Sequence, residues 1–320
     1  MTVSWVGWTL FNGFVLLMLA LDLGVFHRKA HAIRPREAFI WTSVWIALAL
    51  LFNLLIYYRA GPQVALEFLT GYVLEKSLSV DNIFVIVMIF SFFRVPAAYQ
   101  HRVLFWGVLG ALVLRGIFIA LGAYVLHRWE WVMYIFGALL VVTGIKMAVK
   151  REDVADLTDN GILKFVRRLV PITPAYHGQR FFVREGGRIL GTPLLLVIVL
   201  VELSDLMFAI DSIPAIFAIT DDTFVVYTSN IFAILGLRSM FFLLAAVVER
   251  FVYLKYGLAV VLTFIGVKML LHDVYKVPIL ASLGIITALI GGSIVVSLLY
   301  PPRDVPEVPG HTDDVHDDAA

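Results

Sequence analysis

The sequence predicts an all-α polytopic membrane protein with about nine transmembrane helices. Of its 320 residues, 61% are hydrophobic and 15% are charged, and the mean hydropathy is +0.91, which is far from the balance of a soluble domain. The apolar runs are long and unbroken, and they lack the alternation of barrel strands. Because only helices and closed barrels satisfy every backbone polar group in a bilayer, these runs indicate helices.

The composition also argues against several classes of function. The formal net charge of +1 offers no concentrated basic surface, so we expect no nucleic-acid partner. The chain contains no cysteine, which excludes disulfides, thiolate metal sites and thiol redox chemistry. Oxygen, imidazole and thioether ligands remain, and we expect no permanent cofactor.

Nine apolar segments approach the roughly 20 residues that a helix needs to cross the hydrocarbon core. In chain order they are residues 5–26, 38–58, 64–93, 103–126, 131–149, 193–220, 224–248, 256–271 and 278–300. The first is predicted to be a retained span, because no basic region precedes it and its positive charges follow the apolar run. Residues 1–300 would thus form one transmembrane domain.

The loops between these segments predict their orientation, because short cytoplasmic loops are rich in Lys and Arg. The basic residues fall in alternate loops, with Arg28, Lys29, Arg34 and Arg36 in the first, Arg94 and Arg102 in the third, and Arg250 and Lys255 in the seventh. The opposing loops hold few basic residues, and one carries the acidic pair Asp221 and Asp222. This pattern predicts an N-terminus outside and a C-terminus inside.

Two polar stretches are predicted to lie on the cytoplasmic side. The loop 150–191 interleaves apolar and basic residues at positions 162–169, which favours an interfacial amphipathic helix. Farther along this loop, the pair Gly186-Gly187 predicts the turn of a short hairpin. The tail 301–320 holds six acidic residues against Arg303, a composition that is typical of disorder.

Spans three to five echo spans six to eight, in units of residues 64–149 and 193–272. The matching positions are Glu75 with Asp205, Asp81 with Asp211, and the motif Gly144-Ile-Lys-Met with Gly266-Val-Lys-Met. The predicted topology makes the two units antiparallel, so they would form an inverted repeat. Such repeats place an ion site near the midplane and support alternating access.

Carboxylates inside the apolar segments form the candidate site. A charged side chain within a span is costly unless it is paired, hydrated or bound to an ion. Residues 201–214 carry Glu202, Asp205 and Asp211, of which the first two share a helical face and the third lies opposite. Pro214 cannot donate a backbone hydrogen bond, so we expect the helix to kink or unwind there and Asp211 to turn toward the other two.

Glu75, Asp81 and Asn82 on the third span complete an oxygen-rich set with no thiol and no central histidine. Such a set suits a hard divalent cation, namely Mg²⁺, Mn²⁺ or Ca²⁺. The alternative is structural pairing with Arg115 and Arg238, although five intramembrane acids outnumber these two arginines. The sequence leaves open whether an ion or an arginine lies between the acids.

Two further function classes compete with transport. Two opposed aspartates can hydrolyse a peptide bond within the membrane by sharing a proton. The chain has none of the Gly-x-Gly-Asp, His-Glu-x-x-His or Gly-x-Ser-x-Gly patterns, so we expect no enzyme. A membrane scaffold, the other alternative, accounts for the long cytoplasmic loop but not for the buried acids.

Three motifs in this background resemble the TerC family of integral membrane proteins, and its Alx-like branch in particular. They are Glu75-Lys-Ser-Leu-Ser-Val-Asp-Asn-Ile-Phe, Val201-Glu-Leu-Ser-Asp-Leu-Met-Phe-Ala-Ile-Asp-Ser-Ile-Pro-Ala-Ile and Thr228-Ser-Asn-Ile-Phe-Ala-Ile-Leu-Gly-Leu-Arg. The likeness extends to about Tyr300. It implies a protein of the bacterial cytoplasmic (inner) membrane that is connected with tellurium resistance, alkaline induction, redox modulation and Mn²⁺ export.

The resemblance also implies roles for individual residues. By motif position, metal binding would fall to Glu75, Asp81, Asn82, Glu202, Asp205, Asp211 and Ser212. Asn230 and Arg238 lie in the adjoining motif, and Arg115 and Pro214 count as supporting residues as well. We therefore expect a secondary transporter whose partners are a divalent cation, protons and the bilayer. Because carboxylates bind cations when deprotonated, Mn²⁺ export by H⁺ antiport is the expected mechanism.

Overall fold

The structure is a computed structural model that describes residues 4–24, 35–129, 131–149, 168, 170–185, 187–245, 253–275 and 277–300. The predicted interfacial helix, apart from Arg168, and the acidic tail lie outside these residues. In chain order the elements are α1 (Trp5–Gly24), α2 (Pro35–Ala60), α3 (Pro62–Phe92), α4 (Ala97–Arg128), α5 (Val132–Val149), β1 (Phe182–Glu185), β2 (Arg188–Gly191), α8 (Pro193–Phe217), α9 (Thr223–Leu235), α10 (Leu237–Leu244), α11 (Leu254–Leu270) and α12 (Ile279–Leu299).

The helices follow the predicted apolar segments. Each segment falls on one helix, except that the seventh falls on α9 and α10, which meet at a bend of 43°. By length and composition, five described helices could cross a membrane, and six if the bent pair is one span. The five are α2, α4, α5, α8 and α12. The all-α membrane architecture is therefore supported, while the count of nine spans and their orientation stay predictions.

Local sequence explains where the helices that hold the site begin. Proline occupies the first turn of α3 and of α8, where its missing N–H costs nothing. Gly61, just before α3, has φ +93°, which glycine adopts without strain. Asp222 caps α9 by accepting hydrogen bonds from the backbone N–H groups of Phe224 (3.0 Å) and Val225 (3.4 Å).

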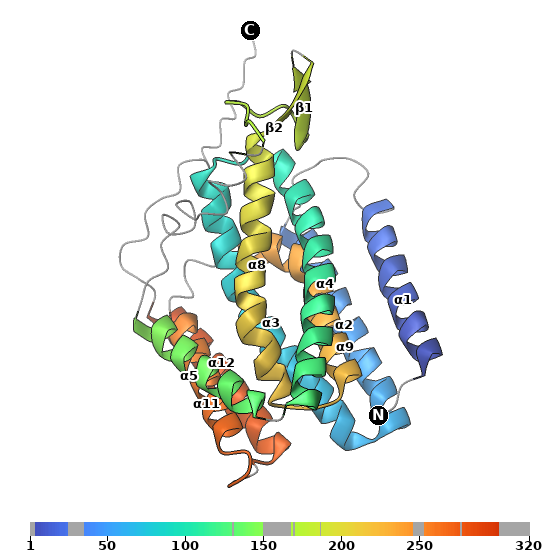
Figure 1. The fold of residues 1–320 in the computed structure, drawn as a ribbon, viewed down its shortest axis with the longest axis vertical. Helices are drawn as coiled ribbons and strands as arrows, with labels where there is room; N and C mark the ends of the chain where they lie inside the picture. Colours follow the sequence, from blue (N-terminus) through green and yellow to red (C-terminus); the bar gives the residue numbers. More distant parts are fainter. Residues whose placement is uncertain are drawn as a thin grey trace.

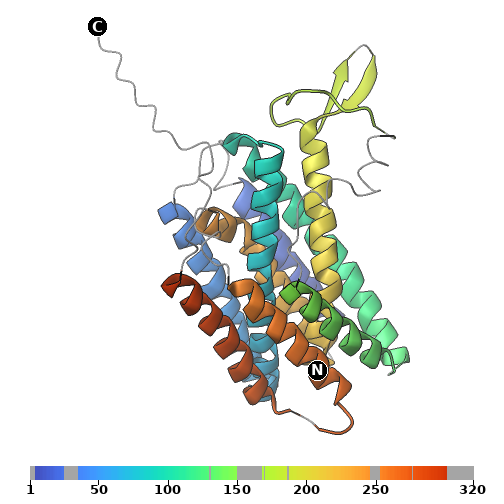
Figure 2. The ribbon, with the colours of Figure 1, turned by 90° about the vertical axis from the view of Figure 1, so that its left-hand side faces the viewer.

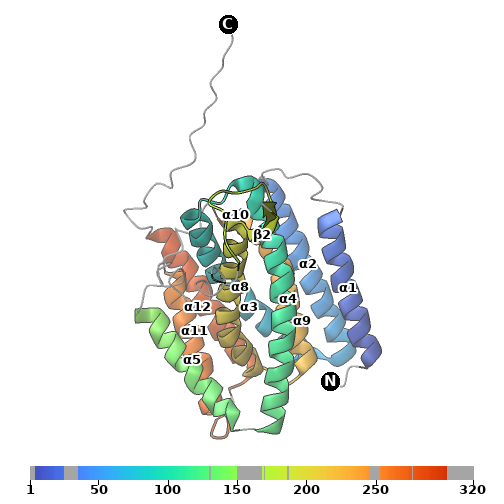
Figure 3. The same ribbon diagram turned by 45° about the horizontal axis from the view of Figure 1, so that its top comes forward.

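Two apolar cores flank the acidic helices α3 and α8. Figures 1 and 3 show α8 near the middle of the molecule, with α5, α11 and α12 to one side and α1, α2 and α9 to the other. Phe68 and Phe232 belong to the core that joins α3, α8 and α9 to α1, α2 and α4. Leu140, Leu258 and Ile286 belong to the second core, with α5, α11 and α12. The acidic stretches are therefore held between two packed regions.

The α5–α11 crossing joins the last helices of the two predicted repeat units through small residues. Gly137 lies against Gly266, and Gly144 lies against Ala259. A Cβ on Gly266 would come within 2.6 Å of the Gly137 carbonyl oxygen, so the two backbones are in direct contact. Positions rise along one helix as they fall along the other, which makes the crossing antiparallel.

A second antiparallel crossing joins the first helices of the two units. Gly71 of α3 lies next to Ile216 of α8, and Asn82 is bonded to Asp205. Two antiparallel crossings between matching helices agree with an inverted repeat, whose orientation in a membrane stays a prediction.

The short hairpin predicted in the loop 150–191 is confirmed. β1 and β2 pair antiparallel, with Phe182 opposite Gly191 and Glu185 opposite Arg188. Gly187 in the turn has φ +79°, which glycine tolerates. Figures 1 and 2 show the hairpin beyond the N-terminal end of α8, clear of the helices.

Candidate functional site

The candidate site lies where α3, α4, α8 and α9 meet. On α3, Glu75 and Asn82 are seven residues apart and therefore share a face of the helix. Asp205 and Ser212 have the same spacing on α8. Asp205 is midway between Pro193 and Phe217, the two ends of α8, so this residue would lie near mid-depth if α8 crosses a membrane.

Arg115 of α4 links the two acidic helices. Its Nε and Nη2 atoms donate to the carboxylate oxygens of Asp205, at 3.3 and 2.8 Å. Its Nη1 atom donates to Glu75 Oε1 and, at 3.1 Å, to the side-chain oxygen of Asn230 on α9. Asn82 Nδ2 adds a hydrogen bond of 3.1 Å to Asp205. Glu75 and Asp205 are thus paired with Arg115. Such pairing is the alternative to a metal ion that the sequence had left open.

These ionic groups are shielded from solvent. The exposed fraction is 1% for Glu75 and for Arg115, and 8% for Asp205. A buried charge without a partner is strongly destabilising, so the guanidinium stabilises both carboxylates. Two carboxylates and one guanidinium still leave one negative charge when all three groups are ionised. The cluster can therefore accept one more positive charge, from a proton or a cation.

Several buried oxygen atoms on α3 and α8 have no hydrogen-bond partner among the described residues. They include Glu75 Oε2, Asn82 Oδ1, Glu202 Oε2 and Ser212 Oγ. Asn82 of α3 is hydrogen-bonded to Asp205 of α8, and the two helices are antiparallel. Glu75, seven residues before Asn82, therefore lies at the same level as Ser212, seven residues after Asp205. Buried acceptors without partners are unfavourable, and a cation or a donor between the helices would satisfy them.

A glycine of α4 makes room for Glu202. A Cβ at Gly110 would overlap the Glu202 carboxyl group, so this carboxyl group lies directly against the backbone of α4. Gly236, at the bend between α9 and α10, lies against the ammonium group of Lys76. Lys76 Nζ donates to the carbonyl oxygen of Ala233 at 3.1 Å. The carboxyl group of Glu202 thus lies against Gly110, and the ammonium group of Lys76 lies against Gly236.

Asp211 lies on another face of α8, away from the Arg115 cluster. Its Oδ1 atom accepts a hydrogen bond of 3.0 Å from Thr143 of α5. The expected unwinding at Pro214 is absent, because α8 stays helical as far as Phe217, and Asp211 does not turn toward Glu202. Burial of this last turn in the apolar core offsets the single backbone hydrogen bond that the proline removes.

The structure does not gather the predicted ligands into one group. Asp81 lies six residues after Glu75 and so on a different face of α3. Within the described part of the chain, no three His, Cys, Asp or Glu side chains are placed to hold a metal ion together. A cation at this site would need amide, hydroxyl or backbone oxygens beside one or two carboxylates. The metal-binding role of the predicted residues stays a prediction.

The supporting positions are buried close to the same region. Asn230 is fully buried, and its side-chain nitrogen donates to the carbonyl oxygen of Val226 at 3.0 Å while its oxygen accepts from Arg115. Arg238 is also buried, two residues after the bend at Gly236. The resemblance to a known family had indicated both residues, and burial is consistent with a role for them in the interior.

Sequence reasoning missed two polar side chains that link the acidic helices to other helices, Thr143 of α5 and Lys76 of α3. Thr143 directly precedes the Gly144-Ile-Lys-Met motif, and Lys76 directly follows Glu75. Both therefore stood next to positions that the repeat had singled out. No local pattern indicates that Thr143 faces α8 or that Lys76 reaches the bend between α9 and α10.

Comparisons with known proteins agree with these motifs. The integral membrane protein TerC family matches residues 60–305. An uncharacterised membrane protein of Myxococcus xanthus is 54% identical over 292 residues, which cover 91% of this chain and 92% of that protein. A protein of Escherichia coli (strain K12) that bears the name of a membrane-bound redox modulator, Alx, is 52% identical over 289 residues, or 87% of this chain and 90% of its own. No solved structure matches the chain.

Proposed function

Because the chain belongs to the TerC family of integral membrane proteins, we propose that it transports a hard divalent cation and that Mn²⁺ export is its main role. The observation that carries this proposal is the set of buried oxygen atoms on α3 and α8 that lack a hydrogen-bond partner among the residues that the structure describes. Carboxylate, amide and hydroxyl oxygens are the ligands that Mn²⁺, Mg²⁺ and Ca²⁺ prefer. Metal homeostasis, including growth at alkaline pH or with tellurite, is the process that such export would serve.

Charge supports a divalent cation over a monovalent one. Glu202 stands one helical turn before Asp205, so its carboxylate adds a negative charge near the cluster of Glu75, Asp205 and Arg115 without joining them as a third acidic ligand of one ion. With all four groups ionised, the net charge is −2, which one divalent cation would neutralise. The contacts of Arg115 then describe the state without cation, and the arriving ion competes with the guanidinium for the same oxygens.

Two antiparallel units give this site a route to both sides of the membrane. In transporters built from inverted repeats, one unit rocks against the other around a site between them. The α3–α8 crossing holds the Arg115 cluster between the two units, so such rocking would open it to alternate sides. Cation release is favoured by protonation of the carboxylates, which couples export to H⁺ entry.

The name borne by the Escherichia coli relative favours a second candidate, a membrane partner that modulates redox processes. This chain has no cysteine, so it would act without thiol chemistry of its own. The two candidates differ in a simple way, because a partner protein moves no ion, whereas a transporter moves Mn²⁺ in the absence of any other protein.

The deciding experiment measures Mn²⁺ flux in sealed vesicles that contain only the purified chain. We expect uptake or release that accelerates when the imposed pH gradient supplies the antiported H⁺. Asp205→Asn and Glu202→Gln should reduce the flux to that of empty vesicles, because each removes a carboxylate of the central cluster. Mg²⁺ and Ca²⁺ competition in the same assay separates Mn²⁺ selectivity from general passage of hard cations.

A matched control is Glu185→Gln, which neutralises a carboxylate of the hairpin, outside the helices. Its flux should equal that of the native chain. Asp81→Asn and Asp211→Asn test whether the outlying aspartates take part. Native flux in both Asp205→Asn and Glu202→Gln would refute the assignment of the site, and absence of flux in the native chain would favour the redox partner.

A further inference from the structure

The contact between α3 and α8 keeps one register over several helical turns. The hydrogen bond between Asn82 and Asp205 sets this register. Gly71 comes eleven residues before Asn82, and it lies against Ile216, which comes eleven residues after Asp205. The two helices therefore stay paired from the Arg115 cluster toward the end of the molecule that the loop charges predict to face outside.

A hydrogen bond continues the register at this outer end. Thr220 Oγ1 donates to Glu67 Oε2 at 2.6 Å, and both residues lie four positions beyond the previous pair. The other oxygen of Glu67 accepts from Gln63 Nε2 at 3.1 Å, and Thr220 Oγ1 accepts from the backbone N–H of Asp222 at 3.2 Å. We call the residues of the two outer pairs the outer seam: Glu67, Gly71, Ile216 and Thr220.

An apolar layer separates this hydrogen bond from the Arg115 cluster. A Cβ on Gly71 would lie 3.0 Å from Ser229 Oγ and 3.3 Å from Ile216 Cγ2, so little space remains at this level. Ile216 and Ser229 are both 0% exposed. In this structure the Arg115 cluster is therefore closed toward the outer end by one apolar contact and one hydrogen bond.

Glu67 lies in line with the cluster along α3. Glu67, Gly71 and Glu75 are spaced by four residues, so they share one face of the helix. With a rise of about 1.5 Å per residue, Glu67 stands roughly 12 Å from Glu75 along the helix axis. Gly71, between them, carries no side chain that would block a cation once Ile216 moves aside. Glu67 is thus the next carboxylate on this face that a cation leaving the cluster would meet.

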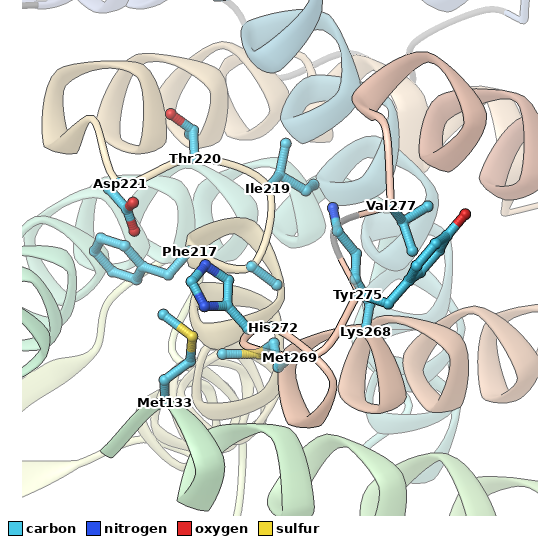
Figure 4. A pocket seen from close by; sticks show the side chains of 11 residues that line it. Met133, Phe217, Ile219, Thr220, Asp221, Lys268, Met269, His272, Tyr275 and Val277 are labelled. Atoms are coloured by element: carbon cyan, nitrogen blue, oxygen red, sulfur yellow. The ribbon is translucent and has the colours of Figure 1, made fainter. Parts of the chain in front are cut away.

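A cavity of about 180 Å³ borders the outer seam at the end of α8. Thr220 and Asp221 belong to its wall, and Figure 4 shows their side chains on opposite sides of the chain. Lys268 also lines the cavity, so its ammonium group balances the carboxylate of Asp221. Balanced charges give a cation little net attraction, which suits a place of release better than a place of binding.

We propose that the outer seam is the outer gate of the cation path and that Glu67 is the group that receives the cation after it leaves the Arg115 cluster. This inference rests on the cation transport proposed above. In the closed state Thr220 donates to Glu67, and Ile216 covers Gly71. When the two predicted units move apart at this end, both contacts break, and the freed carboxylate of Glu67 binds the passing ion.

The gate is tested by access to a single reporter behind it. The chain contains no cysteine, so Ser229→Cys introduces one thiol next to Gly71. The experiment measures its rate of reaction with a membrane-impermeant methanethiosulfonate added to the outer face of sealed vesicles. The reaction should be slow in the otherwise native chain. Thr220→Val keeps the shape of the side chain and removes the hydrogen bond, so it should accelerate the reaction at least about fivefold.

Glu67→Gln separates the charge of this residue from its hydrogen bond, because glutamine still offers Thr220 an acceptor oxygen. The reaction of Ser229→Cys should stay within about twofold of its rate in the native background. The maximal Mn²⁺ flux should fall, while the Mn²⁺ concentration at half-maximal flux stays the same. Native maximal flux in Glu67→Gln would overturn the assignment of Glu67 as the receiving group.

The matched control is Ser79→Cys, because Ser79 is 1% exposed and follows Glu75 by four residues, on the inner side of the cluster. Its reaction from the outer face should stay slow with and without Thr220→Val. Equal acceleration at both reporters, or no acceleration at Ser229→Cys, would overturn the gate. The labelling requires no transported ion, so a failure of Mn²⁺ transport alone would leave the difference between the two reporters in place.

Discussion

The two crossings that join the predicted repeat units are held by opposite means. At the α5–α11 crossing, glycines let two backbones touch, and the residues in contact are small. At the α3–α8 crossing, an arginine and an amide hold carboxylates together, and several buried oxygen atoms have no hydrogen-bond partner in the described part of the chain. The close backbone contact of the α5–α11 crossing leaves no room for a ligand. The α3–α8 crossing has an excess negative charge and, among the described residues, hydrogen-bond acceptors without donors.

This difference suggests which crossing is fixed and which one can change its contacts. A backbone contact between glycines tolerates little change in separation, because its atoms are already at van der Waals distance. A polar cluster with unsatisfied acceptors can exchange one partner for another. We therefore infer that α5 and α11 form the fixed contact between the units and that the α3–α8 crossing is the place where a cation changes the structure.

The largest expected effect is at the polar crossing. Arg115→Met removes the positive charge between Glu75 and Asp205 and leaves two buried carboxylates without it. Loss of one partner from a buried ion pair destabilises a protein by about 3–5 kcal/mol. We expect a loss of this size in the free energy of unfolding, measured by thermal or chemical unfolding in detergent. Mn²⁺ should restore part of it, because the cation would replace the missing charge.

Arg128→Met is the control for this prediction, since Arg128 is exposed at the end of α4. It should cost less than about 1 kcal/mol, as surface charges usually do. If Arg115→Met were no more harmful than Arg128→Met, the two acids would not depend on the guanidinium. Combining Arg115→Met with Asp205→Asn should recover stability, because one of the uncompensated carboxylates becomes neutral.

The second effect is at the backbone crossing. Gly266→Ala places a methyl group within 2.6 Å of the Gly137 carbonyl oxygen and 2.9 Å of the Val141 amide nitrogen. Backbone atoms cannot rotate aside as a side chain can, so the helices must separate. Overpacking of this kind costs about 1–3 kcal/mol. Unfolding curves should show a loss in that range, and added Mn²⁺ should not restore it.

Gly284→Ala provides the matched comparison, because a Cβ on Gly284 of α12 meets no atom within 4 Å. It should leave the unfolding curve almost unchanged. Alanine has the higher helix propensity, so a loss as large as that of Gly266→Ala would mean that the cost does not come from the α5–α11 contact.

Much of the fold follows from the sequence because apolar runs and loop punctuation are local signals. The runs gave every helix of the core, and Gly186-Gly187 gave the hairpin turn. The acidic spacing also identified α3 and α8 as a pair, because a repeat is visible without knowing the packing. Burial of Glu75, Asp205 and Arg115 agrees with the prediction that these residues are interior.

The arrangement of the site does not follow from the sequence, because it depends on which helix faces which. The spacing of Glu202, Asp205 and Asp211 shows that a straight helix cannot bring them together, and Pro214 offered a local remedy. In the structure α8 stays a regular helix, and Thr143 of α5 donates a hydrogen bond to Asp211 without any change in the course of α8. A partner from a distant helix makes local distortion unnecessary, and that partner carries no signal in the sequence around α8.

The smallest expected effect concerns the link between the two crossings, the hydrogen bond from Thr143 of α5 to Asp211 of α8. Thr143→Val keeps the shape of the side chain and removes the donor, which should cost about 1–2 kcal/mol in stability. Thr42→Val is the control, because Thr42 Oγ1 is buried without a hydrogen-bond partner among the described residues, so its removal should cost almost nothing. If the fixed crossing steadies Asp211 through this bond, Thr143→Val should also alter Mn²⁺ flux, whereas Thr42→Val should not. Equal flux in both variants would show that the two crossings act separately and would confine cation movement to the Arg115 cluster.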